Sequence, residues 1–323
     1  MVTMTYGEAA KNALREEMHR DPAVWALGED LRRGGVFGQY KGLPEEFGPD
    51  RISDAPISEA AIMGVAVGAA LSGTRPVVEM RFADFALCAV DELVNQAAKA
   101  RYMFGGQAKV PLVVREPMGM WRSSAAQHSQ SLESWYTHIP GLVVVCPSSP
   151  VDNYGLLKSA IRSDDPVVYM EHKNLWALEG EVDNNDPLPL GRRRLLRTGD
   201  DLTILSWSAT VHEAVAAAAT LETEGASVEV IDLRTLWPWD KERVFDSVKK
   251  TGRLIVAHES VQAGGFGAEI AATVSDVLFR DLKAPVKRLG APRVPIAYAP
   301  PLEDTVRVTA TMIAETARGL MKM

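Results

Sequence analysis

Residues 51–73, RISDAPISEAAIMGVAVGAALSG, constrain the fold more than any other stretch of the sequence. A short strand-like run ends near Ile57, Ser58 offers an N-cap, and Glu59 stands in the first turn of a helix. From Ala60 to Leu71 almost every residue is apolar, so the helix has no polar face and is predicted to be buried. Glu59 is therefore expected at the mouth of a strand-to-helix turn, where open α/β sheets bind ligands. An acidic residue there can also do no more than complement the helix dipole.

The composition bounds the class of protein. The 323 residues, of which 46% are hydrophobic and 24% charged, suffice for two globular domains. A net charge of −7 argues against nucleic-acid binding, and the longest apolar run is too short to span a membrane. Cys88 and Cys146 lie in apolar surroundings and are expected to be buried free thiols in a reducing compartment. Residues 1–20 read as an amphipathic helix rather than a signal peptide, so a cytoplasmic location is expected.

Short apolar strands alternate with helices in both halves of the chain. This pattern predicts parallel sheets covered on both faces, in two tandem α/β domains. The alternation lapses between about Trp176 and Arg197, where an acidic, then proline-bearing, then basic segment reads as a domain linker or an exposed crossing. The linker itself is placed at residues 186–200. A glycine-rich stretch at residues 32–50 is too irregular to be predicted as an element.

The turn Gly264–Gly267 invites comparison with a dinucleotide-binding loop, but it fails that fingerprint. The third glycine of the motif would fall at position 270, which is Ile270. We therefore expect either a tight strand-to-helix turn or a nest of amide groups for an anion or a partner.

A few side chains outside the first helix are candidates for chemistry. His128 lies on a long loop after a predicted strand, a common position for catalytic groups, although a lone loop histidine can simply be solvated. Phe82 and Phe85 lie between a strand and a helix, where Phe82 is expected to pack in the core and Phe85 could offer a flat surface to a ring. The spacing of residues shows neither a serine hydrolase elbow nor a zinc motif.

Five segments together carry a resemblance to a known family. They are PISE followed by the apolar helix, RFADF, VNQAAKARYMFGG, AQHSQS and HIPGLVVVCPSSP, in this order. The combination resembles the β subunit of the thiamine-diphosphate-dependent decarboxylase component of 2-oxo acid dehydrogenase complexes, over nearly the whole chain. It implies a parallel-sheet pyrimidine-binding domain at residues 1–185, the linker at 186–200, and a transketolase C-terminal-like α/β domain at 201–323.

The resemblance also implies roles for single residues. Glu59 corresponds to the glutamate that hydrogen-bonds N1′ of the cofactor's aminopyrimidine, and Phe85 to the residue that stacks on that ring. Ile57 and Glu29 fall at further cofactor-binding positions. His128 corresponds to the histidine that assists acyl transfer to lipoyl groups, a task that suits an imidazole near neutral pH.

The same resemblance implies two bound ions, K+ and Mg2+. A structural potassium ion is expected where the family binds one, mostly through backbone carbonyls, at Leu112, Ala160, Ile161, Ser163 and Asp165. The Mg2+ that accompanies the diphosphate is expected elsewhere, because this chain has no Gly-Asp-Gly followed by a suitable asparagine. An α subunit is therefore expected to hold Mg2+ and the diphosphate, in an α2β2 heterotetramer that serves a lipoyl acyltransferase.

The substrate is left open between 2-oxo acids and acetoin. AQHSQ and RYMFGGQAKVPLVVR resemble the pyruvate and acetoin members, whereas RRGGVFGQYKGL and RFADF resemble the branched-chain members. Trp121 could narrow the substrate pocket or touch a partner. Two other functions are compatible with parts of the sequence. One is a scaffold subunit without catalysis, with the Gly264–Gly267 turn and the last helix as docking candidates. The other is a self-sufficient transketolase-type enzyme, which the missing diphosphate motif disfavours.

Overall fold

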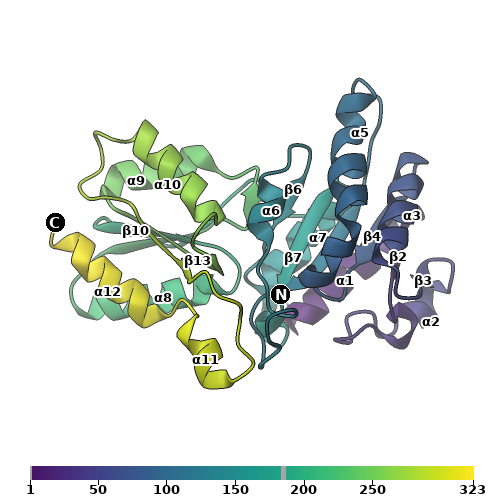
Figure 1. The fold of residues 1–323 in the computed structure, drawn as a ribbon, viewed down its shortest axis with the longest axis horizontal. Helices are drawn as coiled ribbons and strands as arrows, with labels where there is room; N and C mark the ends of the chain where they lie inside the picture. Colours follow the sequence, from purple (N-terminus) through teal and green to yellow (C-terminus); the bar gives the residue numbers. More distant parts are fainter. Residues whose placement is uncertain (1, 183–186) are drawn as a thin grey trace. The chain divides into compact units, whose positions relative to one another are not determined.

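The structure, a computed structural model, describes residues 2–182 and 187–323. It divides into two compact units (Figure 1). The first consists of the described residues up to Met118 together with Trp135–Leu190, and the second of Gly119–Ser134 and Gly191–Met323. The predicted boundary at residues 185 and 186 lies outside the described residues. The described part of the predicted linker, 187–200, contains the division between the units, and its residues 194–197 form a strand.

The first unit is built on parallel strands in the order β6, β7, β5, β4, β2 and β3. These strands are apolar runs such as those of parallel sheets buried on both faces. The strands of this unit, with the short antiparallel pair β1 and β8, are β1 (Val2–Thr5), β2 (Val24–Gly28), β3 (Ile52–Asp54), β4 (Arg75–Glu79), β5 (Val113–Met118), β6 (Val143–Val145), β7 (Val167–His172) and β8 (Glu179–Val182).

Helices cover this sheet. They are α1 (Tyr6–Arg20), α2 (Leu43–Phe47), α3 (Glu59–Leu71), α4 (Ala83–Ala86), α5 (Ala98–Met103), α6 (Glu133–Thr137), which crosses the division between units, and α7 (Pro150–Arg162). α1 and α7 pack against each other and enclose a core with alternate strand residues, such as Val77 and Val113. The glycine-rich stretch predicted as irregular contains α2 and a short 3-10 turn at Leu31–Arg33.

A buried charge network joins three strands of this sheet. The Arg115 guanidinium donates to the Glu171 carboxylate over 2.7 and 2.9 Å, and it lies 3.2 Å from the Glu79 carboxylate. Tyr40 donates to Glu79 over 3.0 Å. Burial raises the pKa of Glu79 to about 7, although Arg115 opposes the shift.

The expectation that α3 is buried on every side is wrong for this chain. One face, with Ile62, Met63 and Ala66, packs inward, whereas Val65 and Leu71 are 57% and 44% exposed. An all-apolar helix sequence predicts that other residues pack on both faces of the helix, but those residues need not belong to the same chain. Ser58 holds the N-cap position, yet its hydroxyl donates to the Pro56 carbonyl instead of capping the helix.

The second unit has its own sheet, in the order β14, β13, β10, β11 and β9, with only β9 antiparallel to its neighbour. Figure 1 shows α9 and α10 on one side of this sheet and α8 and α12 on the other. The elements are β9 (Arg194–Arg197), β10 (Leu202–Ser206), α8 (Thr210–Thr223), β11 (Val228–Asp232), β12 (Thr235–Trp237), α9 (Lys241–Thr251), β13 (Leu254–Val261), α10 (Phe266–Val277), β14 (Lys287–Ala291), α11 (Pro300–Thr305) and α12 (Ala310–Met321).

The glycine turn before α10 has a packing role. The His258 ring, fully buried, stacks on Trp207 at 5.0 Å between ring centroids. A Cβ atom at Gly265 or Gly267 would come within 2.7 Å of that ring. The prediction of a tight strand-to-helix turn is therefore confirmed, and the glycines are explained by their close approach to an imidazole.

Two further features bear on the expectations from composition. Cys146 is buried, but Cys88 is exposed, so the prediction of two buried thiols is wrong for Cys88. Cys88 belongs to the short turn after α4, whose inward positions are taken by Ala86 and Ala89. No helix within residues 2–182 and 187–323 is both long enough and apolar enough to cross a membrane.

Candidate active site

Three charged side chains meet where neighbouring strands of the first unit end. Glu29 follows β2, Glu59 begins α3 after β3, and Arg81 follows β4. Arg81 lies 3.6 Å from the Glu29 carboxylate and 3.4 Å from that of Asp30. Burial and then the nearby charge of Glu59 raise the pKa of Glu29, and Arg81 opposes them. The Glu29 and Glu59 carboxylates and the Arg81 guanidinium thus share, with the adjacent Asp30 carboxylate, the end of the sheet at which parallel strands place ligand sites.

Aromatic rings adjoin this charged group. Phe85, on α4, meets the edge of Phe82 at 5.3 Å, and Phe82 in turn meets Phe37 at 6.0 Å. Phe37 stacks on Trp176, and the ammonium group of Lys173 lies 4.6 Å from the Phe82 centroid. Phe82 is therefore held on several sides, as expected of a packing residue. Phe85 is only partly buried.

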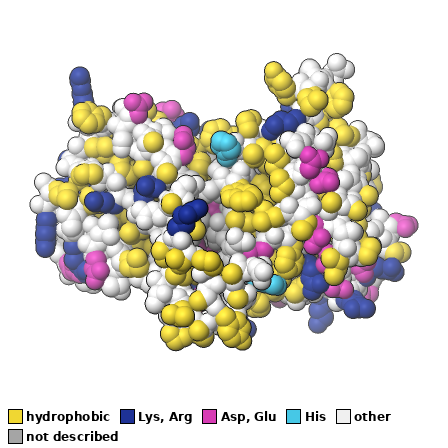
Figure 2. Space-filling model, in the orientation of Figure 1, with side chains coloured by type: hydrophobic (Ala, Val, Ile, Leu, Met, Phe, Trp, Pro, Cys, Tyr) yellow, Lys and Arg dark blue, Asp and Glu magenta, His cyan; other side chains and the backbone are white. Residues whose placement is uncertain are grey.

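The residues around the start of α3 are accessible to solvent. Ile57 is 75% exposed and Glu59 is partly exposed. Both adjoin the uncovered face of α3. Hydrophobic side chains also gather over the end of α5, where Tyr102 and Met103 are 89% and 74% exposed (Figure 2).

His128 belongs to the second unit, within the segment Gly119–Ser134. Two glutamates fix the backbone of this segment. Glu259, on β13, accepts from the Met120 amide and from the Ser131 hydroxyl, each over 2.9 Å. Glu303, on α11, accepts from the Ser123 amide over 2.9 Å. The loop that carries His128 is thus tied at its two ends and in its middle to elements more than a hundred residues away.

The same loop is held in an unfavourable backbone conformation. Arg122, Ser123 and Ala125 have φ of 44°, 58° and 61°, in the left-handed region that side chains other than glycine rarely adopt. Such residues tend to occur at functional sites, where the surrounding structure imposes the conformation. Here the bonds from Glu259 and Glu303 supply that constraint. Neither glutamate could be predicted from the sequence, because both come from segments distant from the loop.

A cavity of about 510 Å³ lies beside this loop in the second unit. Its wall includes both neighbours of His128, Gln127 and Ser129, and it also includes Glu259 and Arg293. The rest of the wall is largely apolar, with Met120, Leu132, Val261, Val294 and Ile296 among its residues. Trp121 is not among these residues, and its ring instead lies under the Arg122 guanidinium at 5.5 Å.

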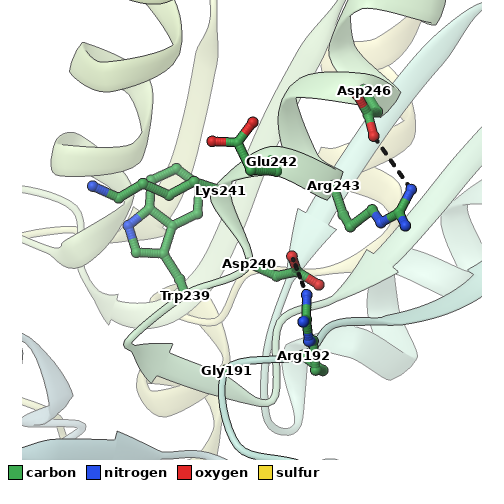
Figure 3. A pocket seen from close by; sticks show the side chains of 8 residues that line it. All are labelled: Gly191, Arg192, Trp239, Asp240, Lys241, Glu242, Arg243 and Asp246. Carbon is green, nitrogen blue, oxygen red and sulfur yellow. Dashed lines mark hydrogen bonds and ion pairs between the residues drawn. The ribbon is translucent and has the colours of Figure 1, made fainter.

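A second hollow in this unit, of about 470 Å³, is less suited to a specific ligand (Figure 3). Its wall carries three basic and three acidic side chains, which largely neutralise one another. Figure 3 shows Arg192 facing Asp240, at 3.8 Å, and Arg243 facing Asp246, at 3.5 Å. The wall as a whole therefore carries no net charge that would favour an anion or a cation.

The five residues expected to hold K+ lie together, but their oxygen atoms are already engaged. Arg75 donates to the carbonyls of Ile161 and Ser163. The Leu112 carbonyl accepts from the Val167 amide, the Ala160 carbonyl from the Ser163 amide, and the Asp165 carboxylate pairs with Arg101. A second unit charge about 4 Å from a guanidinium would cost about 4 kcal/mol at an effective dielectric of 20. These residues do not fit a potassium ion.

One buried acidic residue, Glu116, was not predicted from the sequence as a site residue. Glu116, at the end of β5, is fully buried, and burial raises its pKa to about 8, so it is mostly protonated at neutral pH. Tyr136 and Asp84 are its polar neighbours, and Asp84 directly precedes Phe85 in α4. The available signal was a glutamate next to an arginine within a buried strand. Elsewhere in the described residues, no group of three histidine, cysteine or acidic side chains could hold a metal ion.

Comparisons with known proteins identify the family of both halves of the chain. Residues 2–177 match the family described as "Transketolase, pyrimidine binding domain", and residues 191–313 match "Transketolase, C-terminal domain". The chain is 45% identical to the β subunit of acetoin:2,6-dichlorophenolindophenol oxidoreductase of Cupriavidus necator, over 97% of this chain and 96% of that protein. It is 43% identical to the β subunit of 2-oxoisovalerate dehydrogenase of Bacillus subtilis, over 99% of both.

A further relative, the pyruvate dehydrogenase E1 component subunit beta of Rhizobium meliloti, is 44% identical over 99% of this chain and 70% of that protein. Among solved structures, a split-gene transketolase described as an inactive beta4 tetramer has the same fold. It superposes with a TM-score of 0.80 at 22% identity, over 99% of this chain and 98% of that one.

Proposed function

The chain belongs to the β subunits of the thiamine-diphosphate-dependent 2-oxo acid and acetoin dehydrogenases, and from that premise we propose which part of the reaction it performs. It holds the aminopyrimidine end of the cofactor at the start of α3, while an α subunit holds the diphosphate and Mg2+. When bound, the cofactor supplies the carbon centre that attacks the substrate and accepts electrons as the bond to its carboxyl or acyl group breaks.

The meeting of Glu29, Glu59 and Arg81 beside Phe85 carries this proposal. Glu59 offers a carboxylate for the pyrimidine N1′, since it stands at a strand-to-helix turn with one side open. Glu29 and Arg81 set the local charge around it, so that a proton can be held at Glu59 or passed to the ring. Phe85 is an aromatic residue in α4 and is only partly buried, so its ring can stack on the pyrimidine.

His128 is proposed to assist transfer of the acyl group to a lipoyl acceptor of the acyltransferase. An imidazole suits that step because it can donate and accept a proton near neutral pH. The Gln127 and Ser129 side chains beside it line the adjoining cavity, which gives an acceptor room to approach. We further propose an α2β2 assembly and a pyruvate-like substrate, with acetoin as the alternative. The uncovered apolar face of α3 supports assembly with another subunit.

The test is a calorimetric titration of thiamine diphosphate and Mg2+ into this chain alone, into a mixture with its α subunit, and into the same mixture carrying Glu59→Gln. We expect binding only in the mixtures, and turnover of pyruvate or acetoin only with Glu59 intact. An exposed glutamate on α10 provides the matched control, Glu269→Gln, which should behave as the unmodified chain. Tight binding by the chain alone, or full turnover by Glu59→Gln, would refute the division of the site.

A further inference from the structure

The turn between α7 and β7 is organised around one arginine. Arg75, at the start of β4, directs its Nη1 at the carbonyl oxygens of Ile161 and Ser163, over 3.1 and 2.9 Å. Its Nη2 donates to the Asp164 carboxylate over 2.8 Å. One guanidinium therefore serves two backbone carbonyls and a carboxylate, a mixture of oxygens that a hard monovalent cation would also use.

Two further basic side chains neutralise the acidic residues of this turn. Lys109 lies 2.8 Å from the second oxygen of Asp164, and Arg101 lies 2.5 Å from the Asp165 carboxylate. Arg101 also donates to the Asp164 carbonyl over 3.3 Å. Hydrogen bonding from Lys109, followed by that from Arg75, lowers the pKa of Asp164, so the carboxylate stays ionised at neutral pH.

We propose that the Arg75 guanidinium is the resident cation of this turn, in the structural role that the resemblance assigns to K+, and that the chain binds no potassium here. The end of α7 leaves carbonyl groups without helical partners, and these must find a donor or a cation. A guanidinium supplies both a positive charge and donors in a fixed planar arrangement. Because it is covalently attached, it is present at every potassium concentration.

The position of Arg75 explains why it is effective. Its side chain is 23% accessible, so solvent screens its charge only partly. β4 runs beside β5, which itself pairs with β7, and this brings Arg75 to the turn that precedes β7. Arg75 thereby links the start of β4 to the chain that connects α7 to β7, as a bound ion would link them.

The proposal predicts how stability responds to salt. The melting temperature of the full chain should be the same in KCl, NaCl and tetramethylammonium chloride at equal ionic strength. Arg75→Met removes the guanidinium but keeps an aliphatic chain, and it should lower the melting temperature by about 5 °C in tetramethylammonium chloride. Potassium should then restore part of that loss, with a saturating dependence on its concentration. Arg318→Met is the matched control, since Arg318 bonds the exposed Glu224 carboxylate.

Several outcomes are decisive. Saturable recovery by K+ in Arg75→Met alone would support the proposal, as would titration calorimetry showing K+ binding to that variant and not to the unmodified chain. Specific stabilisation of the unmodified chain by K+ would overturn it, because the ion would then bind beside the arginine. The proposal would also be overturned if the melting temperature of Arg75→Met were no higher in KCl than in tetramethylammonium chloride. None of these results depends on cofactor binding or turnover.

Discussion

The buried His258 should make the second unit acid-sensitive. Burial is the main cause that lowers the pKa of this ring from 6.5 to about 4, against a hydrogen bond with Ser260 that raises it. Between these two values the unfolded chain binds a proton that the folded chain does not. The contribution of neutral His258 to stability is thus complete above pH 6.5 and is lost as the pH falls toward 4.

The size of the effect follows from the shift. Each pH unit between the two pKa values changes the free energy of unfolding by about 1.4 kcal/mol. Between pH 7 and pH 5 this amounts to about 2 kcal/mol, and the full interval to about 3 kcal/mol. These values belong to His258 alone, since other buried groups, such as Glu116, shift in the opposite sense.

The measurement is guanidinium unfolding of the unmodified chain and of His258→Phe at pH 5, 6 and 7, with intrinsic tryptophan fluorescence as the signal. Phenylalanine can stack on Trp207 but cannot titrate. We expect the difference in unfolding free energy between the two proteins to change by about 2 kcal/mol from pH 7 to pH 5, with the unmodified chain losing more. A difference that stays constant across this range would refute the reasoning, because it would mean that His258 titrates normally or not at all.

Two further substitutions test particular contacts. Glu259→Ala should slow acylation of a lipoyl acceptor about tenfold or more, because the His128 loop loses two hydrogen bonds to a carboxylate. Glu259→Gln keeps the accepting oxygen and should recover most of the rate. Hydrogen exchange at residues 120–131 should rise only in the alanine variant. Gly141→Ala should destabilise the first unit by about 2–4 kcal/mol in chemical unfolding, since its φ is +102° and its Cβ would come within 1.9 Å of the Ala98 carbonyl oxygen. Gly105→Ala, with φ of +61° and open space around it, should cost about 1 kcal/mol, and equal losses in the two variants would contradict the steric argument.

Much of the fold was predictable because it rests on local patterns. Apolar strands alternating with helices indicated parallel sheets in both halves, and the structure has them. The failed dinucleotide fingerprint at Gly264–Gly267 correctly pointed to a tight turn. Its cause, the His258 ring, could not be read, because the sequence does not say which side chain faces a glycine.

The candidate site was predictable in part, for a related physical reason. Glu59 could be placed at a strand end from the helix it begins, and Glu29 from the strand it follows. Glu259 and Glu303 could not be found, since their bonds to the His128 loop join segments far apart in the sequence. The position of Arg75 in the sequence also carried a signal for buried polar partners. Arg75 is a charged residue at the start of a buried strand, and such a residue needs partners.

The network of Arg115, Glu79 and Glu171 has a consequence for how relatives of this chain can diverge. Each charge comes from a different strand, and all three side chains are almost completely buried. Replacing Arg115 alone would leave uncompensated acids in the core at a cost of about 3–5 kcal/mol, whereas replacing the whole group by apolar residues of similar volume can be neutral. Substitutions at these three positions should therefore be correlated across related sequences, with single changes rare and joint changes tolerated.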